Sequence, residues 1–579
     1  MSTQSQTQEN IEPACEYNGA DAVIASLKSQ EVKTLFGIVG GSIMPVYDAL
    51  YRDGTLKHII VGHEQGAAHM ADGFARATGR PGVVITTSGP GATNLVTGLA
   101  NAMMDSVPLV AITGQVNSTL LGNDAFQEAD MWGITMPITK HNYQVGTPQE
   151  LPQTFAEAFY VALSGRPGPV LIDLPKDVCT APCPRLLAVP EPPEGYETPY
   201  EGDPYEIETA LELLRQAKRP VILAGGGVII AGACAELRSL AEGLNIPVTS
   251  TLMGLGNFPR SHPLSLGMPG MHGTGYANLA LHHCDLLLCV GCRLDDRVTG
   301  QVDRFAPHAK LIHIDVDASE IGKILPSHAP IVGDAKPVLK SLADQAAAWQ
   351  VRPDYSLWLK QIEQYKRAHP LSYQLKDGVI MPQQAIEVLG RILPEDTIIA
   401  TGVGQHQMFT AQYYPFEKPR RFITSGGLGS MGFGLPAALG AKLGCPRSTV
   451  VCIDGDGSFL MNIQELATAV RYRIGVVTVV LNNSCLGMVR QWQELFYDNR
   501  LSETKLQCPA YDKVAQAFGG LGRRVERPAE LEPAIKWALA QCEEQSLPVV
   551  LDVQVDPDEC VLPMVPPGKA NVDFIPCKR

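Results

Sequence analysis

The chain has 579 residues, of which 45% are hydrophobic, and carries a formal net charge of −14. At about 150 residues per domain, this length predicts three or four domains, each with its own core. The acidic balance, with a pI near 5.4, argues against nucleic acid or an anionic membrane as a partner, and no apolar run is long enough to cross a bilayer.

Cysteine usage and the N-terminal segment indicate a reduced, cytoplasmic protein. The 14 cysteines are scattered and mostly lie in apolar stretches, as buried free thiols do. Cys289 and Cys292 form a C-x-x-C pair. A redox or metal role is its weaker interpretation, because the pair lies in an apolar strand and lacks a second pair at zinc-site spacing. Residues 1–17 are polar and free of arginine, which predicts a disordered tail and neither a signal nor a transit peptide.

Strand and helix patterns alternate over residues 18–189, the predicted N-terminal domain, and this rhythm predicts a parallel α/β sheet. Glycine-rich turns at residues 40–41 and 88–91 fall at strand-to-helix junctions, where such sheets bind ligands. The expected elements are a strand at 58–61, a helix at 64–78, a strand at 83–87, a helix at 92–104 and a strand at 109–114.

Glu64 lies in the first turn of the predicted 64–78 helix. An acid there ordinarily stabilises the helix dipole, whereas a catalytic role requires a partner for the carboxylate. His63 and His69 lie close by in the sequence, but their spacing is not i,i+4 and no third ligand is evident, so packing is favoured over zinc binding. The residues alone leave both interpretations of Glu64 open.

Further boundaries follow from composition. A proline- and acid-rich linker is predicted at residues 190–206, and a mixed helical linker at 351–380. They enclose a central α/β domain at 207–350 and precede a third domain at 381–556. The proline-broken residues 557–579 predict either a lid or a disordered tail.

The central domain carries a weak dinucleotide pattern. Its first strand ends in three glycines, at residues 225–227, but these do not complete G-x-G-x-x-G spacing. Strands are also expected near 247–250, at 286–290 and at 311–314. The last of them ends at Asp315, where an acid meets a ribose hydroxyl in Rossmann-type sites, and Arg293 and Arg297 are candidates to meet a pyrophosphate.

Residues 450–492 combine a strand, an acidic turn, a helix, a second strand and an amide turn. Because right-handed crossovers bring the carboxyl ends of parallel strands together, Asp456 and Asn483 are expected to be neighbours. Their oxygens suit Mg²⁺, and Gly455 and Gly457 let a phosphate approach the backbone. A plain surface turn is the alternative. The expected elements are strand 450–453, turn 454–457, helix 462–469, strand 476–481 and helix 486–496.

Two other patterns in the third domain each have competing interpretations. Residues 427–432 match G-x-G-x-x-G between a strand and a helix, but the acidic turn on the next strand already provides a phosphate site, which makes NAD the weaker choice. Met488 and Trp492 are four residues apart and share a helix face. A core role is the default for them, although the helix is polar and begins at the expected metal site.

Several motifs carry a family resemblance. Gly-Asp-Gly at 455–457 followed by Asn-Asn at 482–483 resembles the thiamine diphosphate signature, and HEQGAAHMADGFARATG resembles the glutamate-bearing helix of the same enzymes. Together with TSGPGATNLVTG, RLDDRVTG, TSGGLGSMGFGLPAA and LNNSCLGMVRQWQELFY, these segments resemble the catalytic subunits of the acetohydroxyacid (acetolactate) synthase family. The resemblance covers about residues 19–566.

This resemblance implies three α/β domains that bind the thiamine pyrimidine, FAD and the diphosphate. Glu64 would hydrogen-bond the pyrimidine ring. Asp456, Asn483 and the carbonyl of Cys485 would bind Mg²⁺. The remaining thiamine diphosphate residues implied are Gly404, Gln405, His406, Gly429, Met431, Gly455, Gly457 and Met488. The FAD residues implied are Arg166, Gly225, Gly226, Thr251, Leu252, Met271, His272, Arg293, Asp315 and Asp334.

The implied activity decarboxylates pyruvate and joins the remaining two-carbon unit to a second pyruvate or to 2-ketobutyrate. It is the first common step of branched-chain amino-acid biosynthesis, and in it FAD does no net redox chemistry. Arg297 would meet the carboxylate of the acceptor, and Trp492 would favour 2-ketobutyrate. Gln127 and Lys176 are catalytic candidates with less defined roles.

The resemblance also implies a homodimer or homotetramer with sites between subunits, because Glu64 and Asp456 lie in different domains, and a small regulatory subunit. Asn117 and Pro567 depart from the plant enzymes near the inhibitor channel, and Leu294 replaces a phenylalanine. The alternatives are a pyruvate oxidase, a glyoxylate carboligase, or a non-catalytic protein that keeps the fold. The presence of Glu64 argues against a glyoxylate carboligase and against a non-catalytic protein.

Overall fold

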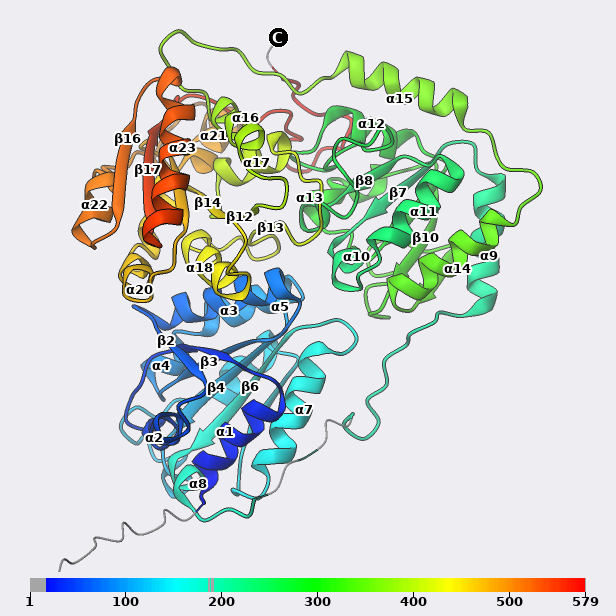
Figure 1. The fold of residues 1–579 in the computed structure, drawn as a ribbon. Coiled ribbons are helices and arrows are strands. Elements are labelled where there is room, and N and C mark those ends of the chain that lie inside the picture. Colours follow the sequence, from blue (N-terminus) through cyan, green and yellow to red (C-terminus); the bar gives the residue numbers. More distant parts are fainter. Residues whose placement is uncertain (1–16, 186–187, 189–191, 578–579) are drawn as a thin grey trace, which may run out of the picture.

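The computed structural model describes residues 17–185, 188 and 192–577. The predicted tail at 1–17 therefore lies outside the described residues except for Tyr17, as do the first two residues of the predicted 190–206 linker. The described chain forms three α/β units, each built on a parallel sheet (Figure 1). The predicted fold class is confirmed.

The N-terminal unit has a six-stranded sheet in the order β2-β1-β3-β4-β6-β5. Strands β3, β4 and β6 are buried along their whole length, as strands covered on both faces are. Helix α3 has the predicted bounds. The strands are β1 (Thr34–Gly37), β2 (Lys57–Ile60), β3 (Gly82–Thr86), β4 (Leu109–Gln115), β5 (His141–Gln144) and β6 (Pro169–Pro175). The helices are α1 (Gly19–Ser29), α2 (Met44–Asp53), α3 (Glu64–Thr78), α4 (Pro90–Thr93), α5 (Val96–Met104), α6 (Met131–Thr135), α7 (Leu151–Leu163) and α8 (Lys176–Thr180).

The predicted helix 92–104 is wrong in detail, because the structure has two helices there, α4 and α5. Pro90 starts the first of them, as proline favours the first helical position. At Leu95 the chain tightens, and the Leu95 N–H donates to the carbonyl of Ala92, three residues back, at 3.1 Å. The side chain of Asn94 meanwhile turns to the Glu64 carboxylate.

The central unit has a five-stranded sheet in the order β11-β10-β9-β7-β8. Edge strand β11 was not indicated by the sequence, because it is short and contains Pro330, a residue that sheets accept at their edges. Helix α9 begins at Pro204, inside the predicted linker. The strands are β7 (Pro220–Ala224), β8 (Val248–Ser250), β9 (Leu286–Val290), β10 (Lys310–Asp315) and β11 (Ala329–Val332). The helices are α9 (Pro204–Gln216), α10 (Gly226–Ile230), α11 (Cys234–Leu244), α12 (Gly275–His283), α13 (Asp296–Thr299) and α14 (Ala335–Ala347).

Helix α15 (Ser356–Ala368) lies over the central unit, and the segment after it crosses the top of the molecule to the C-terminal unit; a helical linker was predicted here (Figure 1). The C-terminal sheet has the order β13-β12-β14-β15-β17-β16. Its strands are β12 (Ile398–Thr401), β13 (Phe422–Ile423), β14 (Val450–Gly455), β15 (Val477–Asn482), β16 (Leu521–Val525) and β17 (Val549–Gln554). Its helices are α16 (Pro382–Ile392), α17 (Gln405–Tyr413), α18 (Gly434–Gly444), α19 (Asp456–Met461), α20 (Glu465–Arg471), α21 (Gly487–Phe496), α22 (Tyr511–Ala517) and α23 (Pro528–Gln545).

The predicted turn at 454–457 and helix at 462–469 need correction. Strand β14 runs on to Gly455, and a helix begins at the next residue, Asp456. An acidic side chain in a first helical turn is favourable, which explains the early start. Helix α19 therefore begins within the predicted turn, and the expected helix 462–469 appears as α20, shifted to residues 465–471.

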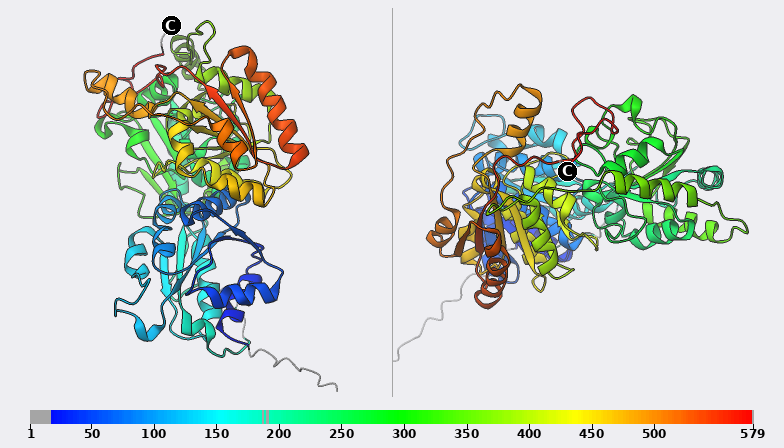
Figure 2. Two further views of the ribbon diagram at one scale, coloured as in Figure 1. Left: turned by 90° about the vertical axis from the view of Figure 1, so that its left-hand side faces the viewer. Right: turned by 90° about the horizontal axis from the view of Figure 1, so that it is seen from above.

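The N-terminal unit lies at one end of the molecule, and the other two units lie side by side above it (Figures 1 and 2). Helix α3 packs along α18, and glycines allow the two backbones to meet. A side chain at Gly73 would clash with the backbone of Ala437, and one at Gly440 with the backbone of Met70. This contact places the helix that begins at Glu64 directly against the C-terminal unit.

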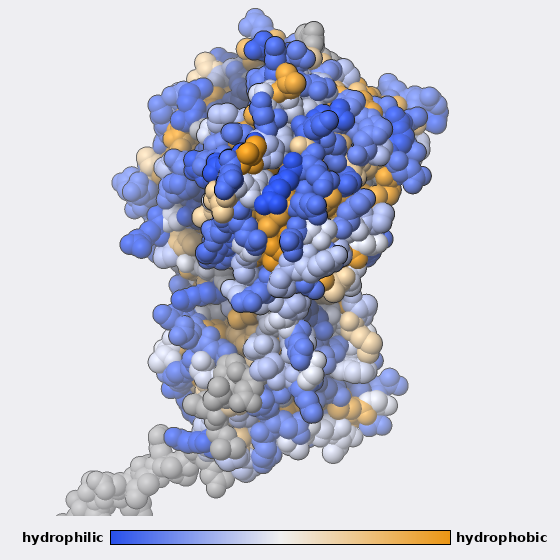
Figure 3. Space-filling model, turned by 90° about the vertical axis from the view of Figure 1, so that its right-hand side faces the viewer, coloured by the Kyte–Doolittle hydropathy of each residue, from blue (hydrophilic) through white to orange (hydrophobic). Residues whose placement is uncertain are grey.

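Figure 3 shows one face of the molecule, on which hydrophilic residues predominate and apolar residues are scattered. Scattered surface apolar residues are usual for a folded protein in water. Within residues 17–185, 188 and 192–577, no helix has the length and apolar character needed to span a bilayer.

Candidate functional site

The ends of β14 and β15 bring an acid and an amide together. The strands are parallel neighbours, with Gly455 opposite Leu481. The backbone N–H of Cys485 donates to Asp456 Oδ2 and to Asn483 Oδ1, at 3.1 Å in each case. The expected closeness of these two side chains is confirmed, while Mg²⁺ binding stays a prediction.

The electrostatics of this corner suit a cation. Burial raises the pKa of the Asp456 carboxyl, which accepts hydrogen bonds only from backbone N–H groups and a thiol among its described contacts. Behind it, burial raises the pKa of Asp454 to about 7 and lowers that of His406 to about 3. His406 is thus neutral, and its 3.4 Å contact with Asp454 is no ion pair. A divalent cation would offset the buried negative charge, and carboxylate and amide oxygens are its preferred ligands.

One large cavity joins this corner to the other two units. Its volume is about 1250 Å³, and it is lined by the carboxyl ends of strands in the central and C-terminal sheets together with residues of the N-terminal unit. The predicted site residues that line it are Arg166, Gly226, Thr251, Leu252, Met271, His272, Arg293, Arg297, Asp315, Asp334, Gly404, Gln405, His406, Gly429, Met431, Gly455, Asp456, Gly457, Asn483, Cys485, Met488 and Trp492.

The central part of the cavity has features of a nucleotide site. Asp315 ends β10, and burial raises its pKa to about 6. Gly226 begins a helix directly after β7. Gly225 does not line the cavity but lies behind it, and a side chain there would clash with the carbonyl of Gly291 and with Cys292. Arg166 reaches across from the N-terminal unit and pairs with Glu320 at 2.8 Å. An acid, a glycine turn and Arg293 are the groups that a dinucleotide such as FAD requires.

Arg297 and the 486–496 region face the same space from two sides. The Arg297 side chain is 60% exposed and touches Asp296 at 3.1 Å, which leaves most of its donors free. The Met271 N–H donates to the Arg297 carbonyl at 2.8 Å and fixes the two residues together. Met488 and Trp492 lie on α21, and Trp492 packs edge-on against Phe496. Met488 and Trp492 both line the cavity, whereas a core role was the default expectation for this pair.

Three predicted residues form a separate group on the N-terminal unit. Glu64, Gln127 and Lys176 are not among the described residues that line the cavity. The Glu64 carboxylate is buried, accepts from Asn94 at 2.9 Å and lies beside the 88–91 turn, as does Gln127. Lys176 is exposed at the start of α8. Within this chain, the structure does not bring Glu64 into the cavity that contains Asp456.

Residues 557–577, part of the predicted lid or tail, form an ordered segment, which we call the strap. Val561, Met564 and Asn571 are buried, so a disordered tail is wrong for this part, and residues 578–579 lie outside the described residues. Gln491 holds Val561 through two hydrogen bonds, of 2.8 and 3.0 Å. The strap then crosses to the central unit, where the Asn571 side chain donates to the carbonyl of Val298, the residue after Arg297.

Cys289 and Cys292 lie 3.0 Å apart, sulfur to sulfur, in the buried core of the central sheet, and both are free. Their apolar packing agrees with the structural interpretation. In the described part of the chain, no group of three or more His, Cys, Asp or Glu side chains is arranged to hold a metal ion. The Asp456 site would use an amide and a carbonyl oxygen, which are outside that set.

Asp105 is a cavity residue that the sequence analysis missed. It caps the C-terminal end of α5, and its carboxylate accepts from Gly426 and Gly427 of the C-terminal unit. A signal for it exists in the sequence, because an acid at the C-terminal end of a helix opposes the helix dipole and requires another partner.

Family models match three parts of the chain in order. Residues 17–134 match the N-terminal TPP binding domain of thiamine pyrophosphate enzymes, residues 207–342 their central domain, and residues 402–553 their C-terminal TPP binding domain. The chain is also 50% identical over 564 residues to a probable acetolactate synthase large subunit of Methanocaldococcus jannaschii, an alignment that covers 95% of this chain and 94% of that one. The chain belongs to the acetolactate synthase large-subunit family.

Bacterial members of the family are equally similar. The Escherichia coli acetolactate synthase isozyme 3 large subunit is 48% identical, with 94% of this chain and 96% of that one aligned. The Corynebacterium glutamicum acetolactate synthase large subunit is 50% identical, with 96% and 90% aligned. The family expected from the motifs is thus confirmed, and with it an enzyme dependent on thiamine diphosphate.

Proposed function

We propose that this chain forms 2-acetolactate from two pyruvate molecules, and 2-aceto-2-hydroxybutyrate from pyruvate and 2-ketobutyrate, as the first common step of branched-chain amino-acid biosynthesis. One observation carries the proposal. A single cavity contains the Asp456–Asn483 corner, the nucleotide-type groups around Asp315, and an exposed arginine opposite an aromatic wall.

Thiamine diphosphate, when bound, supplies the carbon centre that cleaves the carboxylate from a 2-keto acid. Asp456, Asn483 and the Cys485 carbonyl would hold Mg²⁺ against its diphosphate, and Gly455 and Gly457 would let that diphosphate approach closely. Support comes from the buried Asp456 carboxylate, which has no cationic side chain among its described hydrogen-bond partners.

FAD would occupy the central part of the cavity. Asp315 would accept a hydrogen bond from a ribose hydroxyl, and Arg293 would meet the pyrophosphate. Thr251, Leu252 and His272 line the same region and would pack against the flavin. Support comes from the glycine turn after β7, because Gly226 and Gly227 line the cavity and have no side chain that would obstruct a ligand.

Arg297 would bind the carboxylate of the acceptor keto acid, for which a guanidinium is a two-pronged donor. Its exposed side chain pairs with only one carboxylate among its described contacts, so it retains free N–H groups. Trp492 and Met488 would form the apolar wall that accommodates the extra methyl group of 2-ketobutyrate. Burial of one methylene contributes about 0.8 kcal/mol, enough for a moderate preference.

We infer a homodimer as the smallest active unit, with a tetramer as its possible extension. Glu64 and Gln127 would reach the cavity of a second copy, and Glu64 would there hydrogen-bond the thiamine pyrimidine. Support comes from the position of Glu64 outside the cavity of its own chain. The relatives are named large subunits, which favours a small regulatory partner. Free cysteines throughout the described part favour the cytoplasm.

The deciding experiment is a colorimetric acetoin assay of purified protein with pyruvate, thiamine diphosphate, Mg²⁺ and FAD. Acetolactate should form, and Glu64→Gln should reduce its rate by about two orders of magnitude, a usual loss for a proton-transfer group. Glu212→Gln is a control, because that acid is exposed on α9 and does not line the cavity. In a parallel assay with added inorganic phosphate and oxygen, production of acetyl phosphate and peroxide in place of acetolactate would assign the chain to a pyruvate oxidase.

A further inference from the structure

Asp105 lies where the three units of the chain meet. It ends α5 of the N-terminal unit, and its side chain is fully buried in its ion pair with Arg76, at 2.9 Å. Its two carboxylate oxygens accept hydrogen bonds from the successive N–H groups of Gly426 and Gly427, at 2.9 and 2.7 Å. A side chain at residue 427 would approach both Asp105 and Arg293 of the central unit to 3.0 Å.

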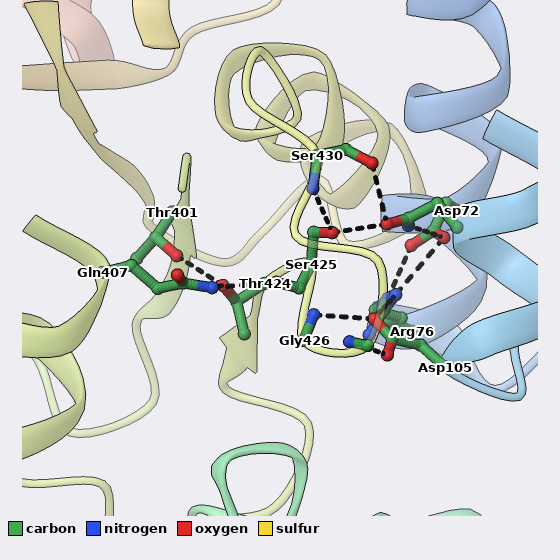
Figure 4. A network of polar contacts seen from close by, with 11 residues as sticks. Asp72, Arg76, Asp105, Thr401, Gln407, Thr424, Ser425, Gly426 and Ser430 are labelled. Atoms are coloured by element: carbon green, nitrogen blue, oxygen red, sulfur yellow. Dashed lines mark hydrogen bonds and ion pairs between the residues drawn. The ribbon is translucent and has the colours of Figure 1, made fainter. Parts of the chain in front are cut away.

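The partner of Asp105 is the turn at residues 425–431, which lines the cavity between β13 and α18. Three of its seven residues are glycines, so the turn has few side chains that could hold its shape. The N-terminal unit contributes several of its fixed points, as Figure 4 shows, while Gln407 of α17 donates to the Ser425 carbonyl at 2.9 Å. Besides the two bonds to Asp105, the Ser425 hydroxyl donates to Asn101 at 2.5 Å, and the Ser430 N–H donates back to Ser425.

Asp105 is itself held by α3. Arg76 bridges it to Asp72 on the preceding helical turn, with distances of 2.5 Å to Asp72 and 2.9 Å to Asp105. Asn101 completes the group by donating to Asp72 at 3.0 Å. The Arg76 guanidinium also lies over the ring of Phe433, two residues after Met431. Buried and fully paired polar groups of this kind are rigid, because every alternative arrangement leaves a charge or N–H unpaired.

We propose that Asp105 is a positioning residue that fixes the 425–431 turn in the shape needed to bind thiamine diphosphate. The inference rests on the proposed function, since the turn carries Gly429 and Met431, two residues assigned to that cofactor. Every described contact of the Asp105 carboxylate is a hydrogen-bond donor. In Asp105→Asn the side-chain NH₂ group would face a hydrogen-bond donor, so one of the two hydrogen bonds to the turn would be lost.

The same arrangement gives α3 two tasks. Its first residue, Glu64, is assigned to the site of a second copy, whereas Asp72 and Arg76, two and three turns further on, support the turn of their own chain through Asp105. A helix transmits a shift of one end to the other, so the geometry of the turn and the position of Glu64 are linked through a single rigid element.

The test compares Asp105→Asn with Asp285→Asn. Asp285 is a matched control, because its two carboxylate oxygens also accept from successive backbone N–H groups, those of Lys218 and Arg219, at 2.9 and 2.8 Å, but it does not line the cavity. Three readouts apply: the dissociation constant of thiamine diphosphate with Mg²⁺, hydrogen exchange of the peptide that contains Gly426 and Gly427, and kcat at saturating cofactor.

For Asp105→Asn we expect the dissociation constant to rise about tenfold, which corresponds to about 1.4 kcal/mol, and exchange at residues 426–427 to accelerate. At saturating cofactor kcat should stay within about threefold of the parent, because the turn is re-formed when the cofactor binds. Asp285→Asn should match the parent in all three readouts. Equal cofactor affinity and equal exchange in parent and Asp105→Asn would overturn the proposal.

If Asp105→Asn fails to fold, Ser425→Ala provides a second test. This change removes another anchor of the same turn and retains every charge. It should raise the dissociation constant in the same direction, by a smaller factor. Unchanged affinity in a folded Ser425→Ala variant would count against the turn as the element that Asp105 positions. If the parent itself fails to bind thiamine diphosphate, it is the proposed function that is wrong.

Discussion

Asp456 and Asn483 share one hydrogen-bond donor, the backbone N–H of Cys485, which lies 3.1 Å from an oxygen of each. Two oxygens that converge on a single N–H are close enough to serve one cation. In the apoprotein that N–H offsets part of the negative charge of the Asp456 carboxylate, which Mg²⁺ would offset in full.

Asp456→Asn should therefore abolish the stabilisation that Mg²⁺ and thiamine diphosphate give to the parent. The stability of the apoprotein should be nearly unchanged. Loss of a buried charge and loss of a hydrogen bond act in opposite directions on the free energy of unfolding. The parent should melt several degrees higher with Mg²⁺ and thiamine diphosphate, and the variant should not. Asp344→Asn, in an exposed pair with Lys340, is the control. A full cofactor-induced shift in Asp456→Asn would remove this residue from the metal site.

Sites shared between two copies predict complementation between inactive variants. Glu64→Gln and Asp456→Asn homodimers should each be nearly inactive. After mixing and subunit exchange, hybrid dimers contain one intact site, and random pairing should restore about a quarter of the parent activity.

The control for this mixture is Asp456→Asn combined with Asn483→Ala. Both changes affect the same corner of the cavity, so their hybrids contain no intact site and should stay inactive. No activity in the Glu64→Gln mixture after verified exchange would place Glu64 and Asp456 in one chain's site. Activity in the control mixture would show that recovery does not depend on a site shared between the two copies.

Trp492→Leu should lower the preference for 2-ketobutyrate over pyruvate as acceptor. The change removes apolar contact area from the wall opposite Arg297, and a difference of about one buried methylene changes the ratio several-fold. Products are measured by competition between the two keto acids at fixed concentrations. Phe496→Leu changes the aromatic partner of Trp492, which is one turn further along α21 and not a cavity-lining residue among those described, and should retain most of the preference.

We expect the titration of Asp173 to make the stability of the N-terminal unit depend on pH. Burial raises its pKa to about 6 from an ordinary 3.8, against the hydrogen bonds from Thr113, Gln115 and Gln144. The folded chain thus binds its proton more tightly than the unfolded chain. Stability from this group is fully present below about pH 4 and is lost as pH rises through about 6, by up to about 3 kcal/mol. Urea titrations of the parent at several pH values should show the slope, and Asp173→Asn should flatten it.

Gln491→Ala should loosen the C-terminal strap. Gln491 is fully buried, and its amide group satisfies both the N–H and the carbonyl of Val561. Leaving these backbone groups unpaired costs about 2–4 kcal/mol. Limited proteolysis should then cut within residues 556–577, which the parent protects. The exposed Gln153, bonded only to Glu157 among its described side-chain contacts, gives the control variant Gln153→Ala. Equal protection in both variants would assign the anchoring to other contacts.

Residues with strong local signals were predictable from the sequence. The strand β9 and the helix α3 appear with the expected bounds, because apolar residues and the turn-forming Gly79 directly after α3 define them locally. The neighbourhood of Asp456 and Asn483 followed from one topological rule, the handedness of parallel crossovers.

Other features depended on contacts between distant segments. Asp105 is tied to Gly426 and Gly427, more than three hundred residues away, and no local pattern defines such a pair. The strap was undecided between lid and tail, because its prolines break regular structure while its burial comes from Gln491 and Val298. The position of Trp492 in the cavity lining became evident only from the cavity itself.

The first and last sheets of the chain have the same strand order, and their third strands end in similar turns. After β3 the chain reads Ser-Gly-Pro-Gly at residues 88–91, and a helix starts at Pro90. Strand β14 ends in Asp-Gly, and a helix starts at the next residue, Asp456. The two sheets thus share one topology and have a helix start at the corresponding place. The two helix starts differ in chemical character, since one has a carboxylate at the position where the other has a proline ring.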